Sequence, residues 1–519
     1  MLEAGNIWEL IVRRAEETPE REMAVDESGR RLSFGDYRRR CERVAAALAA
    51  RGVAEGAVVP WILPTWLEAM VLFGALRRLG AVQNPILPIY REREVGFIVR
   101  QATPALLVVP GTWRGFDYRA MVEPLVDGTS TMLLTCDRSL PEGDPTTLPP
   151  APGDDMRADG APARYLYYTS GTTADPKGAR HGDRALGAAA LGMAERLQLT
   201  ADDRFAFVFP ISHIAGGVYL YASLAYGLTF VLDEAFDPAS TIELLRRERI
   251  TQAGAGTFFH QAYLRAQREL PAGEKLFPHV RAFPGGGAPK PPQLHYDLKA
   301  AFGGAGIVSG YGLTEAPILT MNDADANDVV LAETEGPAVD GVALRIVTLD
   351  GQEAAPGEEG EVRAKGPQVT LGYLDPALDA DAFDDDGWFR TGDLGRLDRG
   401  GNLTITGRLK DVIIRKGENV SAKEVEDLLF THPSVADVAV IGLPDSERGE
   451  RVCAVVVPQG DPGAAALSLD DVTRHLRDAG LSARKLPEQL EIVDTLPRNP
   501  TGKVLKPALR QRFARPLRA

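Results

Sequence analysis

Apolar residues recur along the first part of the chain with spacings that alternate between helical and strand periodicity. The segments 6–20 and 34–52 repeat apolar side chains every three to four positions, which predicts two helices. Ser33 supplies an N-cap for the second helix, and Gly52 ends it. The elements predicted next are a strand at 58–63, an amphipathic helix at 67–79, strands at 81–86, 105–109, 205–208 and 230–232, a helix at 242–249 and a strand at 282–284. This alternation favours α/β layers with largely parallel sheets.

From about residue 340 the pattern changes to short strands. They are predicted at 342–347, 360–364, 394–398 and 403–406. A mixed tail follows, with strands at 412–415, 435–442 and 451–457 and helices at 421–430 and 468–478. This tail of roughly 110 residues is large enough to fold as a unit. We expect an α/β protein whose large N-terminal domain, residues 1–408, has α/β layered subdomains and a β-rich subdomain. A small α+β C-terminal domain, residues 411–519, would follow it.

Composition narrows the class of protein. At 519 residues the chain exceeds what one hydrophobic core usually serves, which agrees with more than one domain. The formal net charge of −14 disfavours nucleic acid as a partner, because phosphate backbones require a basic face. Only three cysteines occur, far apart and without metal-like spacing, which is typical of a reducing compartment. With no signal peptide and no apolar segment of membrane-spanning length, we expect a cytoplasmic protein without a membrane span.

The most informative local pattern is a loop rich in hydroxyls and glycines, which follows an apolar, aromatic run at 165–168. Hydroxyls and exposed backbone N–H groups donate hydrogen bonds to phosphate oxygens, glycine permits close approach, and a lysine adds positive charge. The loop is not a Walker A motif, since the chain lacks that spacing. Taken alone, it is equally an ordinary polar turn. Its candidate phosphate-binding residues are Thr169, Ser170, Gly171, Thr172, Thr173 and Lys177.

Six further motifs follow this loop. They lie at 209–217, 285–290, 310–315, 388–393, 407–411 and 498–503. Taken together and in this order, the motifs resemble the adenylate-forming superfamily of acyl-CoA synthetases, luciferases and peptide-synthetase adenylation domains, over essentially the whole chain. The resemblance implies that the protein activates a carboxylic acid with ATP and Mg²⁺ and transfers it to coenzyme A. It also implies that the C-terminal domain is mobile.

The same resemblance implies which residues contact the nucleotide. Glu315 would hold Mg²⁺ together with Thr172, and Thr314 would contact the α-phosphate; a carboxylate oxygen beside a hydroxyl suits this metal. Asp393 would accept both ribose hydroxyls, and Arg408 would donate to them. The residues implied around adenine are Gly287, Ala288, Pro289, Tyr311 and Gly312. Taken singly, each such residue is more simply an exposed aspartate, a surface arginine or a core tyrosine, and only the joint set indicates a site.

Three lysines and a glycine of the C-terminal region acquire roles in the same way. Lys503 would bridge the substrate carboxylate and the α-phosphate, where a cation is needed because two anions approach each other. Lys410 would be the hinge of a domain rotation, with the pivot at 409–411. Lys416 and Gly417 resemble the loop that lines the pantetheine tunnel for coenzyme A. The simpler alternative for Lys503 and Lys410 is a solvated lysine in a turn.

The substrate side of the site favours a non-amino acid. An amino-acid-activating relative would be expected to keep an aspartate near His213 for the α-ammonium group, and the segment 209–217 contains no acidic residue. His213, which we also count as catalytic, matches an aromatic position beside the acyl pocket; alternatively it is a structural histidine. The other predicted substrate-binding residues are Ala215, Gly216, Gly217, Thr257, Phe258, Gly285, Gly286 and Gly310.

Several stretches resemble ligases for alicyclic and medium-chain acids, of the cyclohexanecarboxylate type. Two other functions stay open at this point. The first is adenylation with transfer to a separate carrier protein or another nucleophile instead of coenzyme A. The second is a non-catalytic nucleotide-binding relative, which the joint presence of Glu315, Asp393, Arg408 and Lys503 disfavours. The oligomeric state is also open, a homodimer included.

Overall fold

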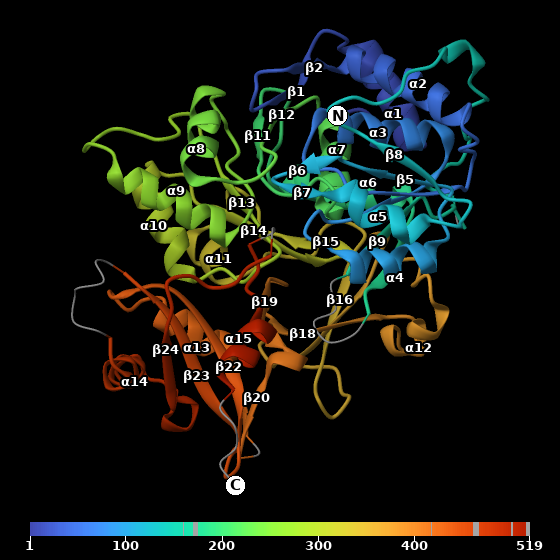
Figure 1. Ribbon diagram of the computed structural model, residues 1–519. Coiled ribbons are helices and arrows are strands. Elements are labelled where there is room, and N and C mark those ends of the chain that lie inside the picture. The colour runs from blue at the N-terminus through green and yellow to red at the C-terminus, as the bar shows by residue number, and fades with distance from the viewer. Residues whose placement is uncertain (159, 170–174, 417, 460–466, 500–501, 515–519) are drawn as a thin grey trace.

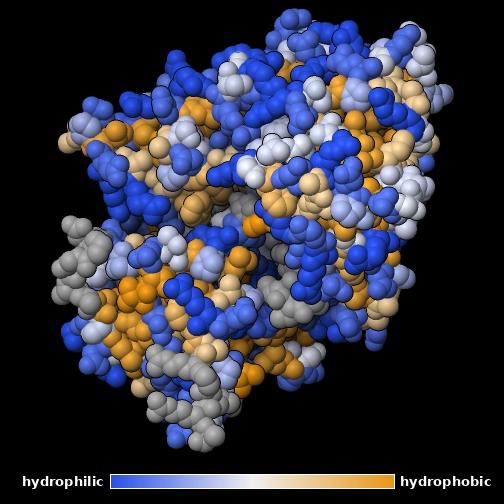
Figure 2. Space-filling view, viewed as in Figure 1, coloured by the Kyte–Doolittle hydropathy of each residue, from blue (hydrophilic) through white to orange (hydrophobic). Residues whose placement is uncertain are grey.

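The structure is a computed structural model that describes residues 1–158, 160–169, 175–416, 418–459, 467–499 and 502–514. Figure 1 shows that the C-terminal residues, coloured orange to red, lie together below the helices and sheets formed by the preceding chain. The surface is hollowed between these two parts (Figure 2). No described helix combines the length and the apolar character needed to cross a lipid bilayer.

A six-stranded sheet forms the first layer of the N-terminal part. Its strands, in spatial order, are β10 (Lys177–His181), β9 (Tyr165–Thr169), β4 (Val82–Pro85), β3 (Val58–Trp61), β5 (Leu106–Val109) and β8 (Met132–Thr135). All neighbours are parallel except β10 and β9, which pair antiparallel. Successive strand residues face opposite sides, so Leu106 and Val108 join one core cluster while Leu107 and Val109 join another. The helices of this region are α2 (Phe34–Ala49), α3 (Leu67–Leu79), α4 (Glu92–Ala102) and α5 (Tyr118–Val126), with the short strands β6 (Thr112–Trp113) and β7 (Phe116–Asp117) and the 3-10 helix η1 (Pro145–Thr147).

Further strands extend the N-terminal part through a second and a third sheet. The second has the order β11 (Arg204–Phe207), β12 (Thr229–Leu232), β1 (Glu22–Asp26) and β2 (Arg31–Ser33), and the third has the order β13 (Phe283–Gly285), β14 (Ile307–Leu313) and β15 (Ala316–Met321). Gln252 connects them, because it bridges in parallel to both Phe205 and Ala282. The accompanying helices are α1 (Ile7–Glu17), α6 (Asp183–Arg196), α7 (Ile214–Tyr226), α8 (Pro238–Arg247), α9 (Thr257–Glu269), α10 (Pro292–Phe302) and α11 (Asp328–Glu333).

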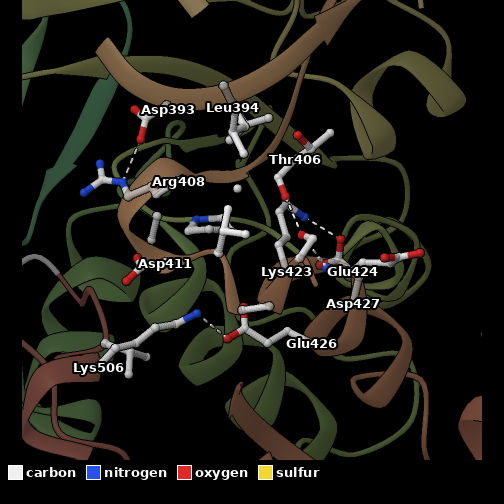
Figure 3. Close-up of a pocket in the computed structure, with 18 of the residues that line it drawn as sticks. Asp393, Leu394, Thr406, Arg408, Asp411, Lys423, Glu424, Glu426, Asp427 and Lys506 are labelled. Atoms are coloured by element: carbon white, nitrogen blue, oxygen red, sulfur yellow. Dashed lines mark hydrogen bonds and ion pairs between the residues drawn. The ribbon is translucent and has the colours of Figure 1, made fainter. Parts of the chain in front are cut away.

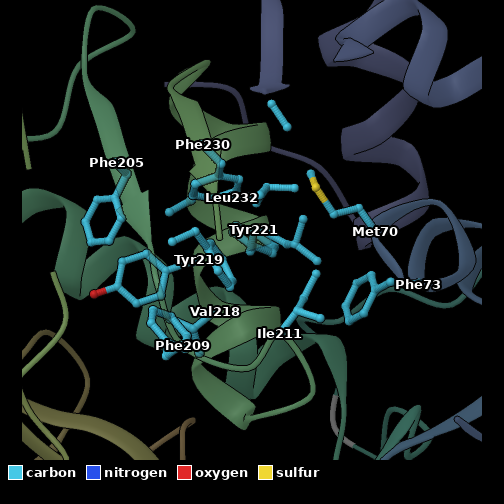
Figure 4. Close-up of a cluster of buried hydrophobic side chains, with 14 of the residues drawn as sticks. Met70, Phe73, Phe205, Phe209, Ile211, Val218, Tyr219, Tyr221, Phe230 and Leu232 are labelled. Carbon is cyan, nitrogen blue, oxygen red and sulfur yellow. The ribbon is translucent and has the colours of Figure 1, made fainter. Parts of the chain in front are cut away.

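Aromatic side chains fill the core beside α7. Figure 4 shows Phe205, Phe209 and Tyr219 gathered on one side of this helix. The ring centroids of Phe205 and Tyr219 lie 4.5 Å apart, and those of Phe209 and Tyr219 lie 5.5 Å apart. These contacts hold the segment that leads into α7 against the second sheet, so the His213 region is part of a packed framework.

A helix forms at 67–79 as predicted, but the prediction that it is amphipathic is wrong. Its bounds agree with α3, but every residue of the helix except Arg78 is buried. The charged residues are accommodated by ion pairs: Arg30 reaches Glu68 at 2.9 Å, and Arg77 reaches Asp183 at 2.7 Å. Buried charges require such partners, and these partners come from segments that no local periodicity connects to α3.

The β-rich region is a four-stranded antiparallel sheet. Its order is β16 (Ala343–Val347), β17 (Gly360–Lys365), β18 (Phe389–Leu397) and β19 (Leu403–Arg408), with η2 (Pro376–Leu378) and α12 (Asp379–Ala382) between β17 and β18. The 3-10 helix η3 (Leu409–Asp411) follows directly. The chain therefore passes into the C-terminal part at residues 408–411.

The C-terminal part has its own sheet and its own buried clusters. The sheet contains β21 (Glu418–Val420), β20 (Ile413–Arg415), β23 (Gly449–Pro458) and β22 (Val435–Asp445), and β24 (Gln489–Ile492) pairs with β23. The helices are α13 (Ala422–Leu429), α14 (Leu469–Asp478) and α15 (Lys506–Phe513), with the 3-10 helix η4 (Ala483–Lys485). Phe430, just after α13, packs against the main core cluster of the N-terminal part. The α/β fold class, with a large N-terminal and a small C-terminal domain, is confirmed.

Candidate active site

A cavity of about 510 Å³ lies between the two parts of the molecule. Figure 3 shows Asp393 and Leu394 at one end of it and Lys506 and Glu426 at the other. Predicted site residues from both parts line it. They are Thr257, Gly287, Ala288, Pro289, Gly310, Tyr311, Gly312, Asp393, Arg408, Lys410 and Lys503. The fold thus brings to one cavity residues that the sequence places in six separate segments.

Asp393 is the centre of a three-residue network on the cavity wall. Tyr311 donates its hydroxyl to Oδ2 of Asp393 at 2.7 Å, and Nε of Arg408 contacts Oδ1 at 2.7 Å. Asp393 and Arg408 are Cα partners on β18 and β19, so strand register places them side by side. Burial raises the pKa of Tyr311 well above its ordinary value, so its hydroxyl remains a donor. A buried carboxylate held in this way is suited to accept hydrogen bonds from a pair of neighbouring hydroxyls.

The glycine-rich segment after β13 forms the facing wall. Gly287 has φ +73°, and a Cβ added there would meet nothing within 4 Å, so its backbone faces open space. Thr257 donates its hydroxyl to the carbonyl of Pro289 at 2.9 Å, which ties this segment to the start of α9. The backbone exposed here and the side chain of Tyr311 line the same cavity.

Thr314 and Glu315 form the turn between β14 and β15. Nε2 of His181 contacts the Thr314 carbonyl at 2.9 Å, and the N–H of Thr370 donates to the Glu315 carbonyl at 2.7 Å. Tyr373 donates its hydroxyl to Oε1 of Glu315 at 2.8 Å. The turn is tight: a Cβ on Gly312 would lie 2.4 Å from the nitrogen of Ile318, which explains the glycine.

Glu315 fits the Mg²⁺ role that the resemblance implies. Burial raises the pKa of its carboxyl, while the Tyr373 hydroxyl and Lys177 oppose that effect. Among the described residues, no group of three or more His, Cys, Asp or Glu side chains is placed to hold a metal. One carboxylate is nevertheless a suitable donor set for Mg²⁺, which usually takes one or two carboxylates and completes its coordination with phosphate and water. Thr172, the other predicted metal residue, lies outside the described residues.

Lys503 reaches the cavity from the loop between β24 and α15. Its backbone N–H donates to Oδ1 of Asn499 at 2.9 Å, and Arg498 and Val504 form a β-bridge that closes the loop. Burial, together with the nearby charges of Arg408 and Lys410, lowers the pKa of Lys503 to about 8. The ammonium group is therefore charged at neutral pH and close to the Asp393 network. An anion entering this cavity would meet it there.

The other predicted residues of the C-terminal region lie apart from one another. Lys410 is in η3, is exposed, and lines the cavity. Lys416 lies at the turn between β20 and β21, with φ +51°, and its N–H donates to the carbonyl of Arg448 at 2.8 Å. It is exposed and does not line the cavity. Gly417 lies outside the described residues.

The two ends of the hydroxyl-rich loop are placed opposite each other. Thr169 is the last residue of β9 and is the antiparallel partner of Lys177, the first residue of β10. Nζ of Lys177 lies 5.4 Å from the centroid of the Tyr373 ring. Ser170, Gly171, Thr172 and Thr173 lie outside the described residues.

The predicted acyl-pocket residues divide into two groups. Thr257 and Gly310 line the cavity. Gly285 and Gly286 are not among its lining residues, although a Cβ on Gly286 would lie 3.1 Å from the carbonyl oxygen of Gly310. Phe258 contacts Gly502 of the lysine loop: a Cβ on that glycine would lie 2.8 Å from Cβ of Phe258.

The second group surrounds the start of α7 and does not line this cavity. His213 is the N-cap of the helix, since its Nδ1 accepts from the N–H of Ala215 at 3.2 Å, and burial lowers the pKa of its imidazole to about 4. A Cβ on Gly216 would lie 1.9 Å from the Ile211 carbonyl oxygen, and one on Gly217 would lie 2.5 Å from Cδ2 of Leu186. Gly216 is thus required by the backbone that it meets, and Gly217 is closely packed against a side chain, reasons that the sequence did not reveal.

Sequence reasoning missed two residues that hold the site together. Tyr373 contacts Glu315, and Arg498 contacts Asp437 at 2.6 Å while its guanidinium lies 5.7 Å from the ring of Phe258. The partners in these pairs lie far apart in the chain, and no periodicity links them. For Arg498 the sequence did offer one signal, because this residue belongs to the same motif as Lys503.

Comparison with known proteins places most of the chain in one family. Residues 11–374 match the family described as AMP-binding enzyme, and residues 424–503 match the AMP-binding enzyme C-terminal domain. The chain is 30% identical to the medium-chain fatty-acid–CoA ligase of Escherichia coli (strain K12), over 96% of this chain and 89% of that protein. It is 32% identical to the salicyl-AMP ligase / salicyl-S-ArCP synthetase of Mycobacterium tuberculosis (strain ATCC 25618 / H37Rv), over 94% of this chain and 87% of that protein. The crystal structure of ATP-bound MatB from Rhodopseudomonas palustris superposes with a TM-score of 0.85 and 30% identity, over 98% of this chain and 99% of that chain.

Proposed function

Because the chain belongs to the family of adenylate-forming AMP-binding enzymes, we propose that it converts a non-amino carboxylic acid to its acyl-adenylate and then to its coenzyme A thioester. The observation that carries the proposal is the convergence of Lys503, Asp393, Arg408 and Tyr311 on one cavity.

In the first half-reaction a carboxylate oxygen attacks the α-phosphorus of ATP, and pyrophosphate leaves. Asp393 and Arg408 hold the ribose, and Tyr311 with the Gly287–Pro289 segment encloses adenine. Lys503 offers the positive charge that two approaching anions require. Glu315 would hold Mg²⁺, which when bound neutralises phosphate charge, and Thr314 contacts the α-phosphate.

In the second half-reaction the sulfur of coenzyme A attacks the acyl carbon, AMP leaves, and the thiol proton passes to solvent. We place the boundary between the moving parts at 409–411, with residues 1–408 and 411–519 as the two domains. Rotation about Lys410 withdraws Lys503 and brings the Lys416 hairpin toward the site. The single passage of the chain at 408–411 and the exposure of Lys410 support this pivot.

We propose a compact apolar acid, alicyclic or of medium chain length, as the substrate. The segment 209–217 lacks an acidic residue, so an α-ammonium group would lose its anionic partner at a cost of several kcal/mol. Burial keeps His213 uncharged at neutral pH, which suits an apolar acyl group. The Escherichia coli relative is named a medium-chain fatty-acid–CoA ligase, which supports the same class.

A carrier protein is the second candidate for the acyl acceptor. The Mycobacterium tuberculosis relative, named a salicyl-AMP ligase / salicyl-S-ArCP synthetase, is about as similar to this chain as the coenzyme A ligase is. Both candidates share the first half-reaction and differ only in the nucleophile that ends the second.

A pyrophosphate-release screen with and without coenzyme A tests the proposal. Cyclohexanecarboxylate, hexanoate, benzoate, palmitate and phenylalanine are compared by kcat/KM, with Lys503→Ala as the background control. We expect graded rates among the compact acids, because each matched methylene contributes about 1 kcal/mol. Palmitate or phenylalanine ranking first would overturn the substrate class. Turnover that coenzyme A fails to stimulate, with no thioester formed, would favour the carrier-protein acceptor.

A further inference from the structure

Tyr373 connects two parts of the candidate site that lie far apart in sequence. Its side chain is buried, and its hydroxyl donates to Oε1 of Glu315 at 2.8 Å. On the face of the same ring, Nζ of Lys177 lies 5.4 Å from the centroid. One aromatic side chain thus contacts both the carboxylate predicted to hold the metal and the lysine at the end of the hydroxyl-rich loop.

The segment that carries Tyr373 is fixed to β10 by backbone hydrogen bonds. The N–H of Leu371 donates to the Arg180 carbonyl at 2.9 Å, and the N–H of Arg180 donates to the Gly372 carbonyl at 3.0 Å. Leu374 extends the pairing by donating to Gly178 at 2.8 Å. Because Lys177 belongs to the same strand β10, the ring and the lysine are positioned by one rigid unit.

The turn that carries Glu315 is followed by a backbone conformation that is unfavourable for its residue. Ile318, three residues further on, has φ +49°, a left-handed conformation that is unfavourable for a β-branched residue. The glutamate side chain has three rotatable bonds, whose ordering costs entropy unless a contact fixes them. Tyr373 supplies a side-chain contact to the carboxylate, and Thr370 of the same segment supplies a backbone contact.

We propose that Tyr373 is a positioning residue that orients Glu315 for Mg²⁺ and Lys177 for the nucleotide phosphates. Its hydroxyl occupies one lone pair of the carboxylate, and a carboxylate has about four, so a metal is accommodated on the remaining ones. Partners that orient a metal ligand in this way usually change metal affinity about 10- to 100-fold when removed. This inference rests on the metal role of Glu315 in the proposed function.

The test measures the affinity for ATP by calorimetry in the absence of a carboxylic acid, once with saturating Mg²⁺ and once with EDTA. The dissociation constant in EDTA divided by the one with Mg²⁺ reports how much the metal strengthens ATP binding. Tyr373→Phe removes only the hydroxyl. We expect it to lower this ratio about 10-fold, with an unchanged dissociation constant in EDTA. Tyr373→Leu also removes the ring face, so we expect it to weaken binding in EDTA as well.

Two further variants separate the possible failures. Tyr118→Phe is the matched control, because its hydroxyl donates to Pro88 at 2.7 Å away from the site, and we expect both constants to stay at wild-type values. Glu315→Gln should lower the ratio at least as much as Tyr373→Phe. If Glu315→Gln lowers the ratio and Tyr373→Phe does not, the role of Tyr373 is overturned and the metal site stands. If Glu315→Gln leaves the ratio unchanged, the metal role fails and this inference fails with it.

Discussion

Gly502 and Phe258 are in direct contact across the two parts of the molecule. A Cβ added to Gly502 would lie 2.8 Å from Cβ of Phe258, and Gly502 has φ +82°. The guanidinium of Arg498 lies over the same phenyl ring. Because Lys503 follows Gly502, this contact determines how closely the lysine loop approaches the N-terminal part, and Phe258 is a docking surface for that loop.

Gly502→Ala should therefore slow acyl-adenylate formation about tenfold, which corresponds to about 1.4 kcal/mol of activation free energy. The added methyl meets a Cβ that cannot move as the end of a flexible side chain can, so the lysine loop is displaced. The measurement is ATP–pyrophosphate exchange. Gly480→Ala is the matched control, since Gly480 has φ +86° but no atom within 4 Å of an added Cβ. Equal losses in both variants would attribute the effect to backbone strain alone.

Lys503→Ala should suppress acyl-adenylate formation by orders of magnitude and leave the thioester step from supplied acyl-AMP largely intact. The cation is needed only where a carboxylate meets a phosphate, so the two half-reactions should separate. Each half-reaction is measured by itself in single-turnover experiments. Equal loss in both would contradict a lysine that serves only the first.

Adenylation by the free enzyme should decline above about pH 8. The pKa of Lys503 is lowered by burial to about 8, so the folded protein loses this charge while an ordinary lysine would keep it. The unfolded chain then binds more protons than the folded one above that pH, so this group's contribution to stability becomes more favourable as pH rises. We expect kcat/KM for pyrophosphate exchange to fall between pH 8 and 9.5. Lys503→Arg, which stays protonated, should lack that decline whatever its absolute rate.

Lys410→Pro should leave adenylation near normal and impair thioester formation at least tenfold. Proline fixes φ and removes an N–H, so a position that must change its dihedral angles is held in one state. The two half-reactions are again assayed separately, with Lys410→Ala as the control for loss of the charge. Full thioester synthesis by the proline variant would exclude Lys410 as the pivot.

The sequence predicted the fold class and most elements because helical and strand periodicity is a local property. It singled out Lys503 and Asp393 because they stand in ordered motifs, and the structure places both on one cavity. The sequence wrongly predicted that α3 is amphipathic, because the partners that neutralise Glu68 and Arg77 in the buried helix come from distant segments. The contact of Tyr373 with Glu315 and the close packing of Gly217 against Leu186 depend in the same way on how β10, α6 and α7 meet in space.

The single passage of the chain at 408–411 also makes Lys503 a tethered reagent. A short covalent link keeps a group near its target at an effective concentration in the millimolar range. The same link provides one Lys503 for each cavity, and that lysine can be in only one place at a time. Under the proposed rotation about Lys410, time that the lysine loop spends with Gly502 against Phe258 is not available for the thioester step, so turnover would be divided between two positions of the C-terminal part.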